Sequence, residues 1–311
     1  MNDPKVIAVV VTYNRCALLP RCLDALMGQG APVAEIIVID NASTDGTREM
    51  LAARYAGRVT PMFMAHNTGG AGGFHQGVAA ATERAPDWIW LMDDDGYPEP
   101  DTLARMLARS DGYGMLNPLV VAEGEPDRLA FGIRLGGRLT TCRVAVEEGA
   151  ASGVIPDEMN PFNGTLVRAE LIARHGNIKP EMFLWGDEVE FALRMLAAGV
   201  RMGTVVDAAF NHPVNRRAVV DLGRIGTVSD CPPAVSHVFY RNSGYYTLRY
   251  RGVVSALGKL GVYTGFLLAR GRLAEVAKLW AYYADGLSGR YALAPTRDEL
   301  LSRLGPAAEN A

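Results

Sequence analysis

In the first part of the chain, short runs of apolar, mostly β-branched residues alternate with segments whose apolar residues recur at helical spacing. The continuous apolar runs predict strands buried on both faces, at 5–12, 35–39, 59–65 and from 88 onwards. Helices are predicted between these strands, at 18–27, 47–55 and 74–84. This alternation indicates a mostly parallel α/β sheet, which binds ligands beyond the carboxyl ends of its strands.

After Asp111 the alternation ends, and the sequence indicates shorter elements. We expect a strand at 112–122, hairpins at 129–146, a strand at 161–167 and a helix at 187–198. Beyond about Pro233 the sequence becomes helical, aromatic and basic. The chain is therefore predicted to contain an α/β domain at 1–232 and a C-terminal helical region at 233–311.

The strand that begins at Trp88 runs directly into three acidic residues, Asp93, Asp94 and Asp95. Three carboxylates do not remain unpaired in a core, so they are expected at a sheet edge that faces a cleft. Strand alternation would place Asp93 and Asp95 on one face, with Asp94 pointing away. Two carboxylates on one face suit a hard cation such as Mg²⁺ or Mn²⁺. The alternative is a solvated turn, because Asp and Gly are common turn residues.

Polar residues also follow the other predicted strands and are expected at the same edge: Thr12, Asn14 and Arg15, then Asp40, then Asn67. The glycine cluster after Asn67 does not fit the G-x-G-x-x-G dinucleotide fingerprint, and the chain has no GK[ST] motif. Unobstructed backbone N–H groups at a helix start instead suit an anion or a sugar diphosphate. The alternative is a glycine-rich turn that permits tight packing.

Several other candidates have an ordinary structural explanation when each is considered alone. Asp40 can accept a hydrogen bond from a nucleobase such as uracil, but Asp also caps turns. A lone histidine such as His212 is more often a surface or core residue than a ligand. Asp187 and Glu188 begin a predicted helix, where the helix dipole favours carboxylates in any case. Trp185 precedes them, and its large aromatic ring suits either stacking on a ligand or burial in the core.

Six short motifs are spread along the chain: VVTYNR (10–15), IDNASTDGT (39–47), NTGGAGGF (67–74), DDDG (93–96), WGDEVEFALR (185–194) and AFNHP (209–213). In type and order they resemble the family 2 glycosyltransferases, which are inverting enzymes of the GT-A fold, over about residues 5–215. The glycine motif combined with the three acids looks most like the bacterial galactofuranosyltransferases. The rhamnosyltransferase branch is the next most similar, and its aromatic YxRN-type segment is echoed at 239–242.

The resemblance implies a GT-A fold, a mixed sheet flanked by helices, and a role for each matching residue. Residues of the donor site would line the nucleotide pocket (Thr12, Asn14, Arg15), bind uracil (Asp40) and border the donor sugar (Asn67, Gly69, Gly70, Gly72). Asp93 and Asp95 match the DxD pair that holds the metal and the diphosphate, with Asp94 between them. His212 would be a further ligand of the metal, Mn²⁺ or Mg²⁺.

On the acceptor side, Glu188 matches the catalytic base of the family, with Asp187 beside it. This chain departs from the family here, since Asp is more common than Glu at that position. Trp185, Asn163 and Gly164 are the candidates for acceptor binding. Direct displacement at an anomeric carbon requires a base for the incoming hydroxyl and positive charge for the departing diphosphate.

The implied function is therefore metal-dependent transfer of galactofuranose from UDP-galactofuranose to a glycan or polyprenyl-diphosphate-linked acceptor, in the synthesis of cell-envelope polysaccharide. A rhamnosyltransferase that uses dTDP-rhamnose is the alternative within the same class. From other classes, a non-catalytic module that binds sugar nucleotides is a further alternative. A nucleotide-dependent oxidoreductase is disfavoured by the missing fingerprint.

The net charge of −3 over 311 residues argues against a nucleic-acid-binding protein, but the charge is unevenly distributed. Residues 237–293 contain eight Lys and Arg against two acidic residues, together with many aromatic side chains. Such a segment suits an anionic membrane surface, where polyprenyl-linked acceptors would lie. The alternative is a helical cap or a homo-oligomer interface with the aromatic residues as its core.

The four cysteines form no CxxC pair, which favours reduced thiols in the cytosol. No charged leader with a cleavage site precedes the first predicted strand. The longest apolar run of the C-terminal part, 260–269, is far shorter than the ~20 residues of a spanning helix. We therefore expect a cytoplasmic protein that is either soluble or peripheral at the inner face of the plasma membrane, and not integral.

Overall fold

The computed structural model describes residues 3–214, 219–221, 227–231 and 233–290. The chain divides into two compact units. The N-terminal unit comprises residues 1–178 and 195–215, and the C-terminal unit comprises residues 179–194 and 216–311. The predicted boundary between 232 and 233 stays a prediction. These units differ from it by grouping residues 179–194 with the C-terminal helices.

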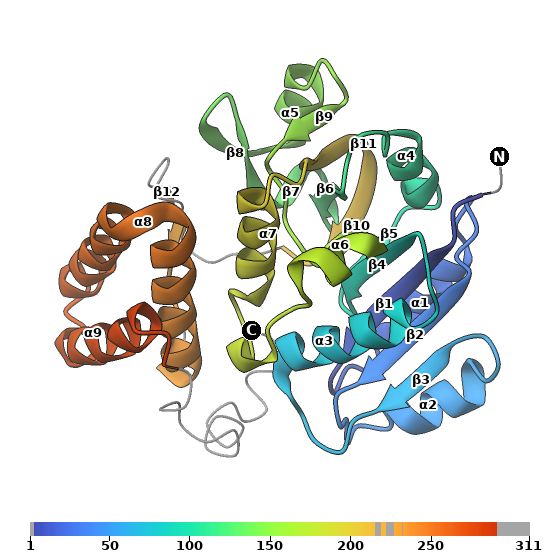
Figure 1. Ribbon diagram of the computed structural model, residues 1–311, viewed down its shortest axis with the longest axis horizontal. Coiled ribbons are helices and arrows are strands. Elements are labelled where there is room, and N and C mark those ends of the chain that lie inside the picture. Colours follow the sequence, from blue (N-terminus) through green and yellow to red (C-terminus); the bar gives the residue numbers. More distant parts are fainter. Residues whose placement is uncertain (1–2, 215–218, 222–226, 232, 291–311) are drawn as a thin grey trace. The chain divides into compact units, whose positions relative to one another are not determined.

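The N-terminal unit is built around one mixed sheet, visible in Figure 1. Its strands are β1 (Val6–Thr12), β2 (Glu35–Asp40), β3 (Thr60–Phe63), β4 (Trp88–Asp93), β5 (Tyr97–Pro98), β6 (Met115–Ala122), β7 (Glu125–Leu135), β8 (Arg138–Cys142), β9 (Val154–Pro156), β10 (Asn163–Arg168) and β11 (Met202–His212). The main order is β3-β2-β1-β4-β10-β6-β11-β5, with β7 on β6, β8 on β7 and β9 on β11. Strands β1 to β4 pair in parallel, whereas β10 runs antiparallel to β4 and β6. The predicted mixed sheet is confirmed.

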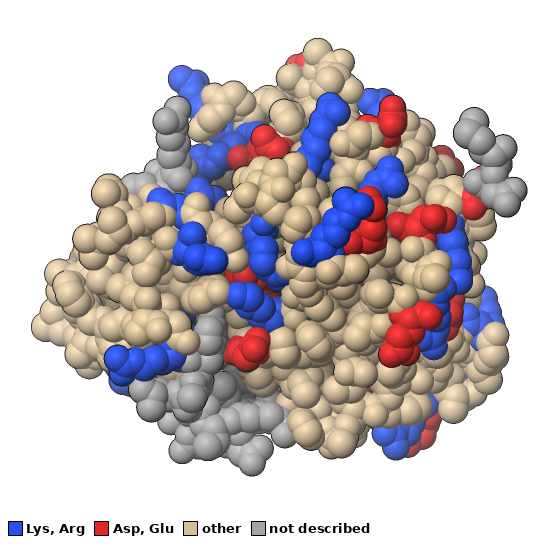
Figure 2. Space-filling view, in the orientation of Figure 1, with Lys and Arg blue, Asp and Glu red and all other residues tan. Residues whose placement is uncertain are grey.

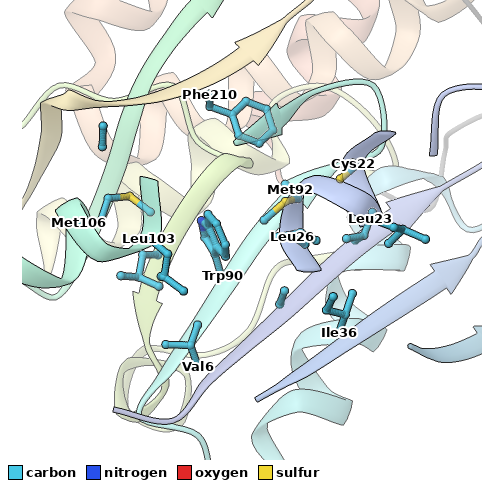
Figure 3. Close-up of a cluster of buried hydrophobic side chains, with 14 of the residues drawn as sticks. Val6, Cys22, Leu23, Leu26, Ile36, Trp90, Met92, Leu103, Met106 and Phe210 are labelled. Carbon is cyan, nitrogen blue, oxygen red and sulfur yellow. The ribbon is translucent and has the colours of Figure 1, made fainter. Parts of the chain in front are cut away.

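Alternate residues of β1 explain how helices cover both faces of the sheet. The helices are α1 (Leu19–Met27), α2 (Thr47–Arg54), α3 (Gly69–Thr82), α4 (Thr102–Ala108), α5 (Arg143–Gly149), α6 (Ala169–His175) and the C-terminal end of α7 (Asp187–Ala197). Val6 and Val10 belong to a buried cluster that includes α1 and α4 side chains such as Leu23 and Leu103, drawn in part in Figure 3. Val9 lies on the other face, where α3 packs directly against it.

Two predicted elements differ from the structure. Helix α3 begins at Gly69 rather than near residue 74, because its glycines let the first turns approach β1 closely. A Cβ atom on Gly73 would lie 2.6 Å from Cγ1 of Val11. The predicted hairpins at 129–146 are formed by β7 and β8 only as far as Cys142, and helix α5 follows. An Arg143–Glu147 ion pair of 2.7 Å spans one turn of that helix.

The C-terminal unit consists mainly of two helices, α8 (Ser236–Ala269) and α9 (Leu273–Leu287), which confirms the predicted helical region. It also contains η1 (Pro180–Met182), the first turns of α7, the hairpin of β12 (Val219–Asp221) and β13 (Thr227–Ser229), and η3 (Pro233–Val235). Its core includes the buried side chains of Tyr240, Leu260, Tyr263, Leu267, Leu279 and Tyr283. Residues 291–311 of the predicted region lie outside the described residues.

One helical stretch of the described chain, Pro233–Ala269, is long and apolar enough to cross a membrane by length and composition alone. The sequence predicts no such segment, because its longest uninterrupted apolar run in this part is 260–269. Gly252, at φ 84° and ψ 171°, interrupts the helical conformation inside this stretch. Arg241 and Lys259 of the same stretch are buried within the protein. Helices of soluble proteins also meet these criteria, so the stretch does not by itself establish a membrane span.

Candidate active site

The carboxyl ends of three adjacent strands bring predicted donor residues to one edge of the sheet. In the parallel register, Thr12 of β1 pairs with Asp40 of β2, and Val11 of β1 pairs with Asp93 of β4. Thr12 and Asp40 are buried, and Asp93 is partly buried. The polar strand ends therefore lie side by side, as the alternating pattern of the sequence leads one to expect.

The loops that follow β1 and β2 are joined by hydrogen bonds. The N–H of Asn14 donates to Oγ of Ser43 at 2.9 Å, and the N–H of Thr44 donates to Oδ1 of Asn14 at 2.7 Å. Oδ1 of Asp40 accepts from the N–H of Ser43 at 2.9 Å. Asn14 has a φ of 53°, in the left-handed region that asparagine adopts more readily than other residues with a side chain. The two loops therefore hold each other in one conformation.

Asn41 connects this edge to the glycine motif, a role that the sequence analysis missed. Its Nδ2 donates to the carbonyl of Gly69 at 2.9 Å, and its Oδ1 accepts from the N–H of Thr68 at 2.9 Å. Oδ1 of Asn67 accepts from the N–H of Gly69 at 2.8 Å. Gly70 and Gly72 follow in the first turns of α3. The position of Asn41 directly after Asp40 was the available signal.

Strand β4 ends at Asp93, so the alternation expected to continue through Asp95 stops there. Arg15 contacts both of the acids that follow. Its Nη1 donates to Oδ2 of Asp95 at 2.9 Å, and its Nε lies 3.7 Å from Oδ1 of Asp94. Asp94 and Asp95 therefore face the same guanidinium group, and the expectation that Asp94 would point away was wrong because the acids lie in a turn.

His212 is brought to these acids by strand pairing. Tyr97 and Pro98 of β5 pair antiparallel with the end of β11, which carries His212. Nε2 of His212 lies 3.3 Å from Oδ1 of Asp95. Gly96 makes this approach possible, because a Cβ there would collide with the ring of Phe210. The predicted convergence of His212 with the acidic turn is therefore present in the structure.

The imidazole ring of His212 is also held from its other side. Its Nδ1 lies 2.7 Å from the carbonyl oxygen of Pro213. The ring of Phe131 packs on it with a centroid distance of 4.8 Å. A contact from Nδ1 to a backbone carbonyl directs Nε2 towards its partner, as is common for metal-binding histidines. Phe131, in a predicted hairpin without charge or motif, gave no sequence signal.

Burial and charge act differently on the two acids of the turn. Burial raises the pKa of Asp94 to about 7, although the positive charge of Arg15 opposes this shift. Burial acts in the same direction on Asp95, but His212 and Arg15 outweigh it and hold the pKa of Asp95 below its ordinary value. Asp95 is therefore the more acidic of the two side chains and loses its proton at a lower pH than Asp94.

The atoms of this turn fit a hard divalent cation. Oδ2 of Asp94 and Oδ1 of Asp95 are buried oxygens that accept no hydrogen bond of normal geometry from the described part of the chain. Among the described residues, no group of three or more His, Cys, Asp and Glu is placed to hold a metal. Mg²⁺ usually takes only one or two protein carboxylates together with substrate phosphates, which matches this arrangement.

The predicted acceptor residues Asn163 and Gly164 lie on β10, the neighbour of β4. Asn163 pairs with Met92, and the N–H of Asp93 donates to the carbonyl of Phe162 at 3.1 Å. Gly164 has a φ of 75°, and its carbonyl accepts from Nε1 of the buried Trp90 at 2.8 Å. Strand pairing therefore places Asn163 next to the end of the strand that carries Asp93.

The other predicted acceptor and base residues lie in the C-terminal unit. Asp187 is the first residue of α7 and is buried, whereas Glu188 and Trp185 are partly buried. Oε2 of Glu188 accepts from the N–H of Gly186 at 2.8 Å. Trp185 packs edge-on against Phe239 of α8, with a centroid distance of 6.0 Å. The three residues therefore form one compact group at the start of α7.

Comparison with known proteins identifies the family. Residues 7–125 match the pattern of "Glycosyl transferase family 2". Galactofuranosyltransferase GlfT1 of Mycolicibacterium smegmatis is 34% identical over 248 residues, which cover 77% of this chain and 82% of that protein. GlfT1 of Mycobacterium tuberculosis is 35% identical over 249 residues, covering 77% and 81%. The chain belongs to glycosyl transferase family 2.

Solved structures show the fold of this family 2 glycosyltransferase. Staphylococcus aureus TarS, solved with UDP, matches 85% of this chain and 70% of its own, with a TM-score of 0.54 at 16% identity. GalNAc-T7, solved with UDP, GalNAc and Mn²⁺, matches 80% of this chain and 48% of its own, with a TM-score of 0.56 at 14% identity. The predicted GT-A fold and the predicted glycosyltransferase class are confirmed.

Proposed function

We propose that this glycosyltransferase transfers galactofuranose from UDP-galactofuranose to a hydroxyl of a glycan or polyprenyl-diphosphate-linked acceptor, in cell-envelope polysaccharide synthesis. The observation that carries the proposal is the approach of His212 to Asp95, at the sheet edge where Thr12 and Asp40 also lie. The choice of donor is supported by relatives named galactofuranosyltransferase, which align with 77% of this chain.

In this proposal, the donor binds along the carboxyl ends of β1, β2 and β4. Asp40 accepts a hydrogen bond from uracil, and Thr12, Asn14 and Arg15 line the nucleotide pocket. Asn67, Gly69, Gly70 and Gly72 border the donor sugar. Arg15 supports this assignment, because a guanidinium group suits a diphosphate and here stands directly at the acidic turn. The hydrogen bonds between the β1 and β2 loops would keep this pocket in shape.

We propose that Asp93, Asp95 and His212 would hold a divalent cation, Mg²⁺ or Mn²⁺, with Asp94 beside them, although the described residues do not already form a three-ligand group. When bound, the cation would supply a Lewis acid for the negative charge of the departing diphosphate. The buried oxygens of the acidic turn and the fixed ring of His212 support this assignment. The structural neighbour GalNAc-T7, solved with UDP and Mn²⁺, is also in keeping with it.

Glu188 is proposed as the base, with Asp187 beside it. Its carboxylate takes the proton of the acceptor hydroxyl while that oxygen bonds to the anomeric carbon. The bond from this carbon to the diphosphate oxygen breaks at the same time, and UDP leaves with its electron pair. The attack comes from the opposite side to UDP, so the configuration inverts. Trp185, Asn163 and Gly164 are proposed to contact the acceptor.

We propose further that the C-terminal helices contact an anionic membrane surface on its cytoplasmic side, where a lipid-linked acceptor would be found. On α8, Val253, Val254 and Leu257 are 58%, 81% and 58% exposed. The exposed Arg249 and Arg251 precede them on the same helix. On the face in Figure 2, the surface over α8 and α9 shows no acidic side chains. Apolar residues beside basic ones are typical of membrane-surface helices.

A panel of UDP- and dTDP-sugars, offered with Mn²⁺ and with glycan and lipid-linked acceptors, tests this function. We expect UDP release from UDP-galactofuranose and a product heavier by one hexose residue. Turnover of dTDP-rhamnose alone would make the enzyme a rhamnosyltransferase. The Glu188→Gln variant is expected to bind UDP like the wild type but to lose turnover. UDP binding without turnover of any donor would indicate a non-catalytic module.

A further inference from the structure

The residues between η1 and α7, 183–186, have an unusual backbone and are called the 183–186 segment below. Phe183 has φ 65° and ψ −63°, and Trp185 has φ 55°, values that bulky L-residues rarely adopt. The N–H of Leu184 donates to the carbonyl of Met182 at 2.8 Å and closes a three-residue turn around Phe183. Such a conformation persists only where the surrounding structure holds it.

The side-chain amide of Asn242 on α8 holds this segment by its carbonyl groups. Its two Nδ2 hydrogens are shared among the carbonyls of Met182 at 2.9 Å, Leu184 at 3.2 Å and Trp185 at 2.8 Å. Asn242 is 0% exposed, so these hydrogen bonds are shielded from water. Gly186 lies against the same side chain, because a Cβ there would be 3.1 Å from Cβ of Asn242.

The guanidinium of Arg241 fixes the orientation of that amide. Its Nε and Nη2 donate to Oδ1 of Asn242 at 3.1 and 3.0 Å. Nη2 also lies 2.9 Å from the carbonyl of Glu181 and 3.2 Å from that of Met182. Arg241 is 2% exposed. Because the amide oxygen is bound by a cation, the NH₂ group is directed to the 183–186 segment.

The segment is tied to α7 at its other end. The N–H of Gly186 donates to Oε2 of Glu188 at 2.8 Å. Glu190, one turn into α7, is fully buried and accepts from the hydroxyl of Tyr250 on α8 at 2.6 Å. Lys179, which precedes η1, lies 3.3 Å from the same carboxylate. A shift of the segment would therefore displace Trp185 and Glu188 together.

We propose that Arg241 and Asn242 are positioning residues for glycosyl transfer, acting through the 183–186 segment on Trp185 and Glu188. The inference rests on the proposed roles of those two residues. The hydrogen bonds of Arg241 and Asn242 described above run to backbone carbonyls and between the two side chains. Arg241 and Asn242 fix the positions of Glu188, the proposed base, and of Trp185, the proposed acceptor contact. Donor binding is proposed for residues of the N-terminal unit.

The Asn242→Asp variant tests this, because an ionised carboxylate keeps the size of the side chain but donates no hydrogen bond to a carbonyl. We expect kcat to fall by about 10-fold to 100-fold and the acceptor KM to rise, with unchanged UDP affinity. Ser243→Ala is the matched control, since Ser243 is equally buried in α8 and its hydroxyl makes no hydrogen bond to the segment. It should keep wild-type kinetics. Wild-type kinetics in Asn242→Asp, or an equal loss of UDP affinity, would overturn the proposal.

Hydrogen exchange of the full-length wild type supplies a readout that does not depend on activity or on the folding of a variant. Peptides that cover 183–186 are expected to exchange as slowly as those from the interior of α8. Arg241→Lys, which keeps the charge but loses the planar fork, should raise their exchange and leave β4 peptides unchanged. Rapid exchange of the segment in the wild type would refute the proposal. If no sugar nucleotide is turned over but the segment is protected, the proposed function fails while the holding role stands.

Discussion

Nε2 of His212, the last residue of β11, lies 3.3 Å from Oδ1 of Asp95, which follows β4. The contact depends on the short strand β5, which pairs with Phe210 and Asn211 just before His212. Because of this pairing, His212 and Asp95, which are far apart in the sequence, lie next to each other. A cation bound there would be sensitive to both.

The first prediction concerns this pair. Asp95→Asn and His212→Ala are each expected to weaken Mn²⁺ binding in the presence of saturating UDP by about 10-fold to 100-fold. Since both residues would bind the same ion, the double variant should lose less than the product of the two effects. Electron paramagnetic resonance of free Mn²⁺ measures the affinities. Asp207→Asn, on the exposed side of β11, is the control and should bind Mn²⁺ normally. Independent effects that multiply would argue against a shared site.

The second prediction separates packing from donor binding at Gly77, a glycine of α3 that follows the glycine motif. In Gly77→Ala the new Cβ would collide with Cγ1 of Val9, so the free energy of unfolding should fall by about 1–3 kcal/mol. Urea denaturation measures this. Gly261→Ala is the control, because nothing lies within 4 Å of the new Cβ and alanine favours a helix by up to about 1 kcal/mol. A Gly77→Ala variant of normal stability that fails to bind UDP would instead place Gly77 in the donor site.

Much of the fold was predictable because its strands are continuous apolar runs. The runs around Val9 and Ile37 are typical of strands buried on both faces, and the alternating helices then favour parallel pairing. The start of α3 was missed, since five residues rich in glycine have low helix propensity, and close packing on β1 overrides that preference. Helix α5 was missed because no glycine or proline after Cys142 marks the end of the hairpin.

The gathering of polar side chains at one sheet edge was predictable where such a residue directly ends an apolar strand, as with Asp40 and Asp93. His212 gave almost no signal by itself, and only the order of motifs connected it with the acids. Residues that act through backbone or ring contacts gave little more, since Asn41 was marked only by its position directly after Asp40. Asn41, Phe131 and Asn242 bind carbonyls or pack on rings, and any short sequence pattern around them is also found in ordinary loops and helices.

The third prediction concerns alkaline pH. Burial, with the hydrogen bond to Asp24, raises the pKa of Tyr55 to about 12. Tyr55 in the unfolded chain loses its proton near pH 10, while in the folded chain it keeps the proton until about pH 12. Its stabilising contribution is therefore complete below pH ~10 and is lost at up to about 1.4 kcal/mol per pH unit above it. Urea unfolding between pH 8 and 11 should show this slope, and Tyr55→Phe should reduce it. An identical slope in the variant would contradict the assignment.

The fourth prediction addresses the membrane surface. Val254→Glu on α8 places a negative charge on the most exposed apolar residue beside Arg251. We expect it to reduce sedimentation with vesicles containing anionic lipids, and to leave UDP binding unchanged. Val144→Glu on α5, at a valine that is 45% exposed, is the matched control. Equal vesicle binding by the wild type and Val254→Glu would exclude this patch as the contact.

Calorimetric titration of the purified protein with UDP, in Mn²⁺ and again in EDTA, tests the central claim most directly. The claim is that the ends of β1, β2 and β4, with His212, form one site for a metal and a nucleotide diphosphate. It predicts one UDP bound per chain with Mn²⁺ and binding at least about 10-fold weaker in EDTA. UDP binding that is equally strong in EDTA, or no UDP binding with Mn²⁺ present, would contradict it.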